Sequence, residues 1–165
     1  MAPLVERYDN LLVVQTCSKS RCLAGARLGF ALGHPALIQD LERIRYSTNP
    51  YNINRMTSAA GLAAIQDNAY YTRRCEQIVQ TRQQTAQALR ALGFEVTDSR
   101  ANFLFAQSDA ISGKDLYEAL KARGVLIRHF TSPRIANYNR ITVGSAEQME
   151  CFLKHTREIL QEVQR

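Results

Sequence analysis

The segment that most constrains the fold of this chain lies near its start. Residues 10–16 (Asn-Leu-Leu-Val-Val-Gln-Thr) form a β-rich apolar run of strand length, which is typical of a strand buried in a parallel sheet. One strand cannot form a sheet, and no strand-like segment precedes this one. We therefore expect the core around it to come from elsewhere: from residues beyond this sequence, from another chain or from an exchanged copy.

Short strands and helices follow along the rest of the chain. Strands are expected over residues 27–31, 94–96, 102–106, 125–129 and 140–143, and helices over residues 36–46, 54–67, 69–92, 113–123 and 147–163. Pro35 suits the start of a helix, and Gly93 and Gly124 each suit the end of one. Ser145 and Gln148 have the spacing of a capping box. These elements predict an α/β fold with a short sheet of about four strands and helices on one face.

The composition excludes several classes of protein. Apolar residues make up 45% and charged residues 22% of the chain, which fits a globular domain and not collagen, a mucin-like stalk or a disordered chain. No apolar run approaches the roughly 20 residues of a membrane span. No signal-peptide pattern occurs at the start, so we expect a cytoplasmic protein with no membrane partner.

The net charge of +6 comes from 21 basic and 15 acidic residues, and only four of the basic residues are lysines. Such an excess of basic residues makes nucleic acid a candidate partner. The arginines are scattered, however, and no aromatic residues interleave with a basic stripe, so we expect no nucleic-acid binding. The four cysteines and three histidines lack the spacing of a zinc site, and we expect reduced thiols and no metal.

Lys19 is the residue with the clearest chemical interest. It lies just past the strand over residues 10–16, and ligand sites in α/β sheets form at the carboxyl ends of strands. Like-charge repulsion from Arg21 and Arg27 would lower the pKa of Lys19 and make its neutral amine available as a nucleophile. A solvated loop lysine is the alternative interpretation.

The same loop carries groups that suit a phosphate. The hydroxyls of Thr16 and Ser18 and the guanidinium of Arg27 are donors that a phosphate monoester needs. A lysine amine beside such donors describes the site of pyridoxal 5′-phosphate (PLP), which binds a lysine as a Schiff base.

The pattern T-x-S-K-x-x-x-L-A-G-x-R-x-G over residues 16–29 resembles the cofactor-lysine segment of the fold-type I, PLP-dependent aminotransferases. Within them it is most similar to the histidinol-phosphate aminotransferase group. Four further blocks follow in the family's order: PYNIN at residues 50–54, SRANFLF at 99–105, GVLIRHF at 124–130 and NRITVGSAEQME at 139–150. The resemblance covers essentially the whole chain.

The resemblance implies roles for residues around the cofactor. Lys19 would hold the cofactor covalently and would move a proton between the substrate α-carbon and the cofactor. Ser18 and Arg27 would bind the cofactor phosphate, and Thr16 is a weaker candidate for the same role. Arg21 departs from the family pattern, in which small or aromatic residues are common at that position.

The resemblance also implies substrate-binding residues. Arg140 would pair with the substrate α-carboxylate, a geometry that suits arginine. Arg128 would contact a side-chain phosphate if the substrate is histidinol phosphate, although Arg134 is a second candidate for that contact. Tyr51 and Asn52 would line the substrate entrance, and ordinary loop chemistry explains them equally well.

Family members are about twice as long as this chain. Their glycine-rich phosphate loop, ring-stacking aromatic residue, and the Asn and Asp that contact the cofactor ring precede the lysine. The resemblance therefore implies the C-terminal part of the aminotransferase fold. Residues 1–50 would be the end of the PLP-binding large domain, and residues 51–165 a small domain that includes the long connecting helix.

The expected function is that of the C-terminal part of an aminotransferase of amino-acid biosynthesis, inactive by itself and dimeric in the complete enzyme. Its substrates would be an amino acid and a keto acid, one of them phosphorylated. An aromatic transaminase or a threonine-phosphate decarboxylase is the alternative with the same fold. A non-catalytic interaction module is the alternative of another class, and it would expose an apolar face.

Overall fold

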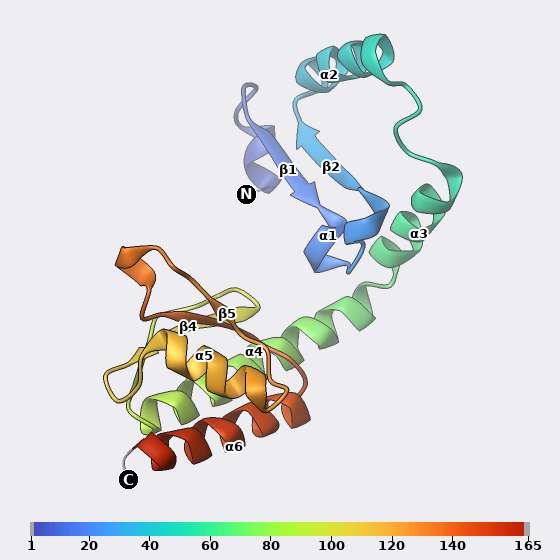
Figure 1. Ribbon diagram of the computed structural model, residues 1–165. Coiled ribbons are helices and arrows are strands. Elements are labelled where there is room, and N and C mark those ends of the chain that lie inside the picture. Colours follow the sequence, from blue (N-terminus) through green and yellow to red (C-terminus); the bar gives the residue numbers. More distant parts are fainter. Residues whose placement is uncertain (1, 164–165) are drawn as a thin grey trace. The chain divides into compact units, whose positions relative to one another are not determined.

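The computed structural model describes residues 2–163 and divides the chain into two compact units, Met1–Thr72 and Arg73–Arg165 (Figure 1). The first unit contains η1 (Ala2–Glu6), β1 (Leu12–Thr16), α1 (Cys17–Ser20), η2 (Ala24–Ala26), β2 (Gly29–Gly33), α2 (Pro35–Thr48) and α3 (Arg55–Gln66). Helix α4 (Asn68–Ala91) begins in this unit and continues into the second. The assignment of residues 1–50 and 51–165 to two domains of a larger enzyme stays a prediction.

Strands β1 and β2 form an antiparallel hairpin, in which Leu12 pairs with Gly33 and Thr16 with Gly29. The expected second strand is therefore present. The expectation of a buried strand in a parallel sheet is wrong for the described residues, since β1 pairs only with β2 and 70% of Val14 is exposed. The physical reason is that an apolar strand is buried only by neighbouring strands and helices, and residues 2–72 do not supply enough of them.

The helices of the first unit begin where their capping residues predict. Pro35 occupies the first turn of α2, and the side chain of Asn54 accepts a hydrogen bond from the backbone N–H of Thr57 to cap α3. A β-carbon at Gly61 would lie 2.2 Å from Leu28 Cδ2. The absence of a side chain at this position therefore lets α3 approach the loop that follows Lys19.

The second unit is a four-stranded antiparallel sheet with helices on one side, as the sequence predicts (Figure 1). Its further elements are β3 (Phe94–Val96), β4 (Phe103–Ser108), α5 (Gly113–Ala122), β5 (Arg128–His129), η3 (Pro133–Ile135), β6 (Asn139–Thr142) and α6 (Ala146–Val163). The strand order is β3-β4-β6-β5.

The core of this unit lies between one face of the sheet and helices α4, α5 and α6. Residues alternate along β4: Leu104 and Ala106 are buried in the core, whereas Phe103 and Phe105 face the other side and are only half-buried. The core side chains from the helices include Leu89, Leu120 and Phe152, each at most 1% exposed. The opposite face of the sheet carries partly buried or exposed side chains, Phe103, Phe105 and Arg140 among them.

The ends of the helices follow local rules. Gly93 and Gly124 have φ angles of +84° and +78°, which favour glycine after a helix. The Ser145 N–H donates to Gln148 Oε1 over 2.9 Å and the Gln148 N–H donates to Ser145 Oγ over 3.3 Å, so the capping box is confirmed.

The strand expected over residues 125–129 is wrong in most of its length. Only Arg128 and His129 pair with β6. Val125 and Ile127 instead pack against the helical core, which explains why their apolar character resembled that of a strand.

None of the helices in the described part of the chain is long and apolar enough to cross a membrane. Within residues 2–163, no group of three or more His, Cys, Asp or Glu side chains is arranged to hold a metal ion.

Candidate active site

Lys19 lies in α1, a single helical turn that begins directly after β1. Thr16 is the N-cap of this turn, since its Oγ1 accepts a hydrogen bond from the Ser18 N–H over 3.1 Å. The cap ends the strand and turns the chain, which places Lys19 beyond the carboxyl end of β1. Its side chain is exposed, so the amine is accessible to a ligand.

The hydroxyls of Thr16 and Ser18 lie side by side. Thr16 Oγ1 donates to Ser18 Oγ over 2.8 Å, and it lies 3.5 Å from the carbonyl oxygen of Leu28. The two hydroxyls therefore lie beside Leu28, the residue that follows Arg27.

Arg27 comes to the same end of the hairpin by a tight turn. Its backbone is left-handed, with φ of 53°, and it ends the short helix η2. Such a conformation is uncommon for a residue with a side chain. Its Nη1 donates to the carbonyl oxygen of Ala24 over 3.3 Å, which holds the guanidinium and leaves its other N–H donors available. The structure therefore brings Thr16, Ser18, Lys19 and Arg27 to one loop cluster.

Arg21 points away to the first turns of α4. Its guanidinium lies 3.7 Å from the centroid of the Tyr71 ring, and its Nη2 donates to Asn68 Oδ1 over 3.4 Å. Both contacts lie within the first unit. Arg21 thus ties the lysine loop to α4, a role that the sequence does not reveal.

Tyr51 and Asn52 lie in the loop between α2 and α3. Tyr51 is 90% exposed, and in the described structure neither residue forms a hydrogen bond or ring contact with the lysine loop. Their role at a substrate entrance stays a prediction.

Arg128 and Arg140 face each other in the second unit. They are directly opposite on β5 and β6, and both side chains are exposed. Arg128 lies 5.7 Å from the ring centroid of Phe130, and Arg140 lies 5.5 Å from that of Phe103. Like charges directly opposite are unfavourable, and an anion between them removes that repulsion. Arg134 lies in η3 and outside this strand pair.

Aromatic side chains that sequence reasoning did not single out surround this pair of arginines. Phe105 stacks on Tyr138 with centroids 4.5 Å apart, and it meets Phe130 edge-on at 5.9 Å. Burial and a hydrogen bond to Glu95 raise the pKa of Tyr138. The alternation of Phe103 and Phe105 along one strand was the available signal, because it places both on the face that carries Arg140.

The family model of aminotransferase class I and II matches residues 1–155. The chain belongs to this family.

Relatives of this aminotransferase chain share much of its sequence. It is 48% identical over 157 residues to a histidinol-phosphate aminotransferase of Brachyspira hyodysenteriae, covering 95% of this chain and 44% of the relative. It is 49% identical over 159 residues to histidinol-phosphate aminotransferase 1 of Bordetella parapertussis, covering 96% and 45%. The chain thus spans a little under half the length of the curated relatives it matches.

A solved aminotransferase also shares the fold. The histidinol-phosphate aminotransferase of Sinorhizobium meliloti, in complex with pyridoxal-5′-phosphate, superposes with a TM-score of 0.78 at 25% identity. The match covers 96% of this chain and 44% of that one. The sequence-based resemblance to aminotransferases and the α/β fold that it implied are therefore confirmed.

The lysine loop has the chemistry that PLP needs at its phosphate and aldehyde ends. An exposed amine, a pair of adjacent hydroxyls and a guanidinium with free donors lie together in it. Hydroxyl and guanidinium donors suit a phosphate dianion, and the amine suits an aldehyde. The residues that are present fit this cofactor.

Proposed function

We propose that this chain provides the lysine loop and the substrate-binding sheet of a PLP-dependent histidinol-phosphate aminotransferase. The single observation that supports this most is the cluster of Thr16, Ser18, Lys19 and Arg27 at one end of the β1–β2 hairpin. In the complete enzyme, the amino group of glutamate would be transferred to the keto acceptor imidazole acetol phosphate.

Each residue of the loop has a distinct role in this proposal. Lys19 would hold the cofactor through its amine and would move the proton at the substrate α-carbon. Ser18 and Arg27 donate hydrogen bonds to the cofactor phosphate, and Thr16 orients Ser18 through their 2.8 Å contact. Bound PLP supplies an electron-withdrawing ring that stabilises negative charge at the α-carbon.

The facing arginines supply the substrate contacts. Arg140 binds the α-carboxylate of the amino donor glutamate, and Arg128, directly opposite it, binds the phosphate of the phosphorylated substrate, which carries no carboxylate. A phosphate dianion, or the two carboxylates of glutamate, supplies enough negative charge and oxygen acceptors for both guanidinium groups, which the single carboxylate of an aromatic amino acid does not. The two facing guanidinium groups and the histidinol-phosphate aminotransferase relatives therefore favour a phosphorylated substrate over the aromatic amino acid that an aromatic transaminase would use. Tyr51 and Asn52 are proposed at the entrance.

The chain alone is proposed to lack transaminase activity. It spans a little under half the length of its relatives, and by the family resemblance the residues that hold the cofactor ring lie in the other part. We further propose a homodimer, in which the neighbouring subunit completes each site, and a cytoplasmic location, where amino-acid biosynthesis supplies the substrates.

Covalent capture of the cofactor tests the role of Lys19. The chain is mixed with PLP at low concentration and reduced with borohydride, and the labelled residue is mapped by mass spectrometry. Lys114, Lys121 and Lys154 are exposed lysines on helices α5 and α6 and serve as internal controls. Label confined to Lys19 is the expected result.

Two variants extend the test to the phosphate contacts. Ser18→Ala and Arg27→Gln should each raise the PLP concentration for half-labelling of Lys19 by roughly tenfold, because hydrogen bonds to charged groups contribute about 1.5–3 kcal/mol. Lys154→Arg is the matched control and should leave the labelling of Lys19 unchanged. Equal labelling of all four lysines would overturn the proposal.

A further inference from the structure

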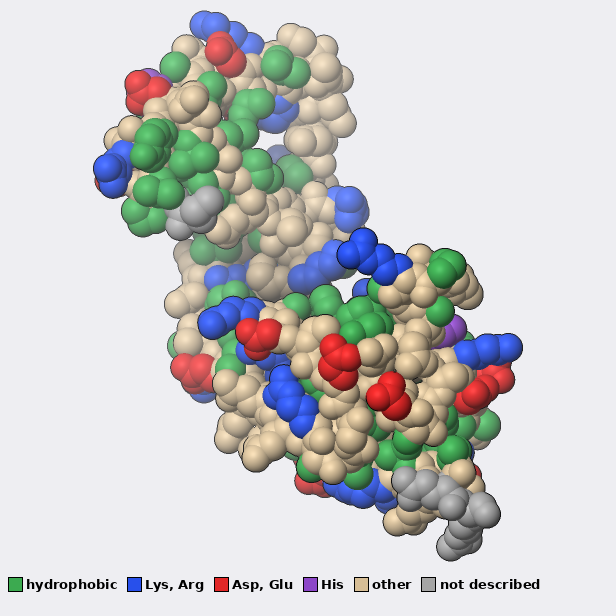
Figure 2. All heavy atoms as spheres, turned by 90° about the vertical axis from the view of Figure 1, so that its left-hand side faces the viewer, with side chains coloured by type: hydrophobic (Ala, Val, Ile, Leu, Met, Phe, Trp, Pro, Cys, Tyr) green, Lys and Arg blue, Asp and Glu red, His purple; other side chains and the backbone are tan. Residues whose placement is uncertain are grey.

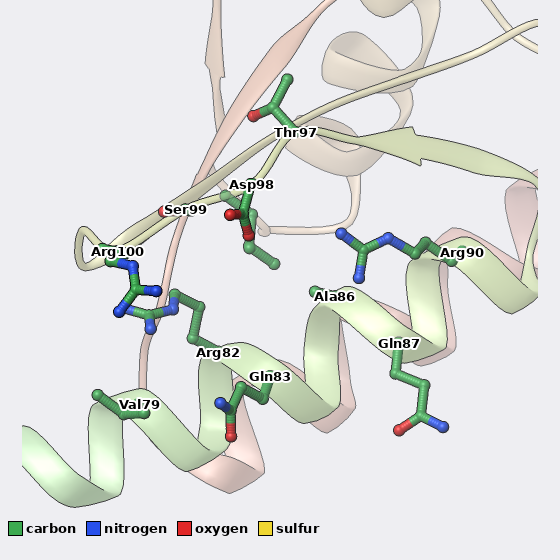
Figure 3. Close-up of a pocket in the computed structure, with 11 residues that line it drawn as sticks. Val79, Arg82, Gln83, Ala86, Gln87, Arg90, Thr97, Asp98, Ser99 and Arg100 are labelled. Atoms are coloured by element: carbon green, nitrogen blue, oxygen red, sulfur yellow. The ribbon is translucent and has the colours of Figure 1, made fainter.

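A groove in the second unit is lined by three arginine side chains. None of them belongs to the lysine loop or to the pair of facing arginines. One wall is the face of α4 that carries Arg82 and Arg90, and the other is the loop between β3 and β4 with Arg100 and Asp98 (Figure 3). The volume of the groove is about 710 Å³. Ligand sites in proteins span roughly 300–1,000 Å³, so the groove is large enough for a small molecule.

Two of the arginines are held in place by backbone carbonyls. Arg82 Nη1 donates to the oxygen of Ala101 over 2.8 Å, and Arg90 Nη2 donates to the oxygen of Val96 over 3.1 Å. Each guanidinium has five N–H donors, so most of them remain available. The positions of these charges are thus set before any ligand arrives, which lowers the entropic cost of binding.

The loop wall is also rigid. Ser99 Oγ donates to the oxygen of Phe103 over 2.6 Å and accepts from the Ala101 N–H over 3.2 Å. These bonds fix the turn from which Arg100 extends. Figure 3 shows that Arg82 and Arg100 point toward each other from opposite walls and that Arg90 extends into the groove from the other end.

The charge of the groove is not neutralised by the chain. In the part of the chain that the structure describes, none of these three arginines forms an ion pair, whereas Arg123 elsewhere in the same unit pairs with Glu162 at 2.7 Å. Asp98 is the one acidic residue among those that line the groove. Three unpaired guanidinium groups and one carboxylate leave an excess of positive charge.

We propose that this groove is a binding site for an oligophosphate anion, such as pyrophosphate or a triphosphate. Arg82 and Arg90 are eight residues apart on α4, which corresponds to about 12 Å along the helix axis. The three guanidinium groups come from separate positions on the two walls of the groove, so an anion with several phosphate groups offers more of them a partner than a single phosphate does. Guanidinium groups also match phosphate oxygens in geometry. This inference is independent of the proposed transaminase function, since none of its residues belongs to that site.

Calorimetric titration of the whole chain with tripolyphosphate at 0.15 M salt, near physiological ionic strength, tests the site. Arg82→Gln and Arg100→Gln should each raise Kd roughly tenfold, the loss expected for a hydrogen bond between charged groups. Asp98→Asn should lower Kd several-fold because it removes the one negative charge. This gain of affinity cannot come from unfolding. Arg157→Gln, an exposed arginine on α6, is the matched control and should leave Kd unchanged.

Other outcomes overturn the proposal. If Arg157→Gln weakens binding as much as Arg100→Gln, the anion responds only to net charge. If Arg27→Gln abolishes binding and Arg100→Gln does not, the anion occupies the lysine loop. Inorganic phosphate that binds as tightly as tripolyphosphate contradicts a site that contacts several phosphate groups. Tighter binding of an acidic hexapeptide makes the groove a peptide site instead.

Discussion

Glu147 shows how single charged groups respond to the fold. A hydrogen bond with the Ser145 side chain and a second one with its own backbone N–H lower the pKa of the Glu147 carboxyl below its usual value of 4.5. The residue lies in the first turn of α6, where a negative charge is stabilised by the N-terminal end of the helix dipole. Its charged form is therefore favoured in the folded chain.

This shift predicts a pH dependence of stability. Because the folded pKa is lowered, the stabilisation by Glu147 is fully present above its unfolded pKa and is lost as the pH falls through the folded value. The free energy of unfolding of the wild type should exceed that of Glu147→Gln at pH 6, and the difference should disappear in acid. Urea titrations at pH 6 and at pH 3 measure it. Glu150→Gln, an exposed acid one turn later, is the control, and an equal pH-dependent loss in both variants contradicts the assignment.

The basic residues on the surface lie close to acidic ones. On the drawn face of the second unit, in the lower part of Figure 2, blue Lys and Arg side chains are interspersed with red Asp and Glu side chains. Like charges come together locally where Arg128 lies opposite Arg140.

At the scale of elements, α6 supports the second unit. Its buried residues recur at helical spacing: Met149, Phe152, Leu153, Thr156, Ile159 and Leu160. This periodicity is visible in the sequence, and the helix expected over residues 147–163 is confirmed for that reason. Strand β5 was harder to predict because two residues carry too little pattern, and its pairing depends on β6.

Neighbouring residues on α6 give a matched test of this packing. Phe152 is 1% exposed, whereas Cys151 beside it lies on the exposed side of the helix. Phe152→Ala should lower the free energy of unfolding of the second unit by about 3–5 kcal/mol. Cys151→Ala should change it by less than about 0.5 kcal/mol. Chemical denaturation followed by far-UV circular dichroism measures both, and similar losses would contradict the packing described above.

At the scale of the whole molecule, the two units differ in how much they bury. Cys17 and Gly61 are the only buried residues between positions 2 and 72, whereas the second unit has one connected apolar core from α4 to α6. Several large apolar side chains of the first unit, Val14 and Met56 among them, are mostly exposed. The first unit thus buries far less apolar surface than the second.

This difference predicts the course of limited proteolysis. Segments with few buried apolar contacts open at low free energy, so trypsin should digest the first unit before the second. A resistant fragment that begins near Arg73 should accumulate, and mass spectrometry of the digestion products identifies its first residue. The prediction fails if residues 1–72 survive as long as the core of the second unit. Addition of PLP should slow the digestion around Lys19 if the cofactor orders its loop.

Features that depend on neighbouring residues along the chain could be predicted before the fold was known. The helical periodicity, the Ser145 capping box, the glycines after two helices and the lysine segment of the family are all local patterns. Three features became visible only in the folded chain: β1 pairs antiparallel with β2, Arg128 lies opposite Arg140, and Arg82, Arg90 and Arg100 share a groove. Strand register and side-chain convergence depend on contacts between distant residues, and those contacts form only when the core packs.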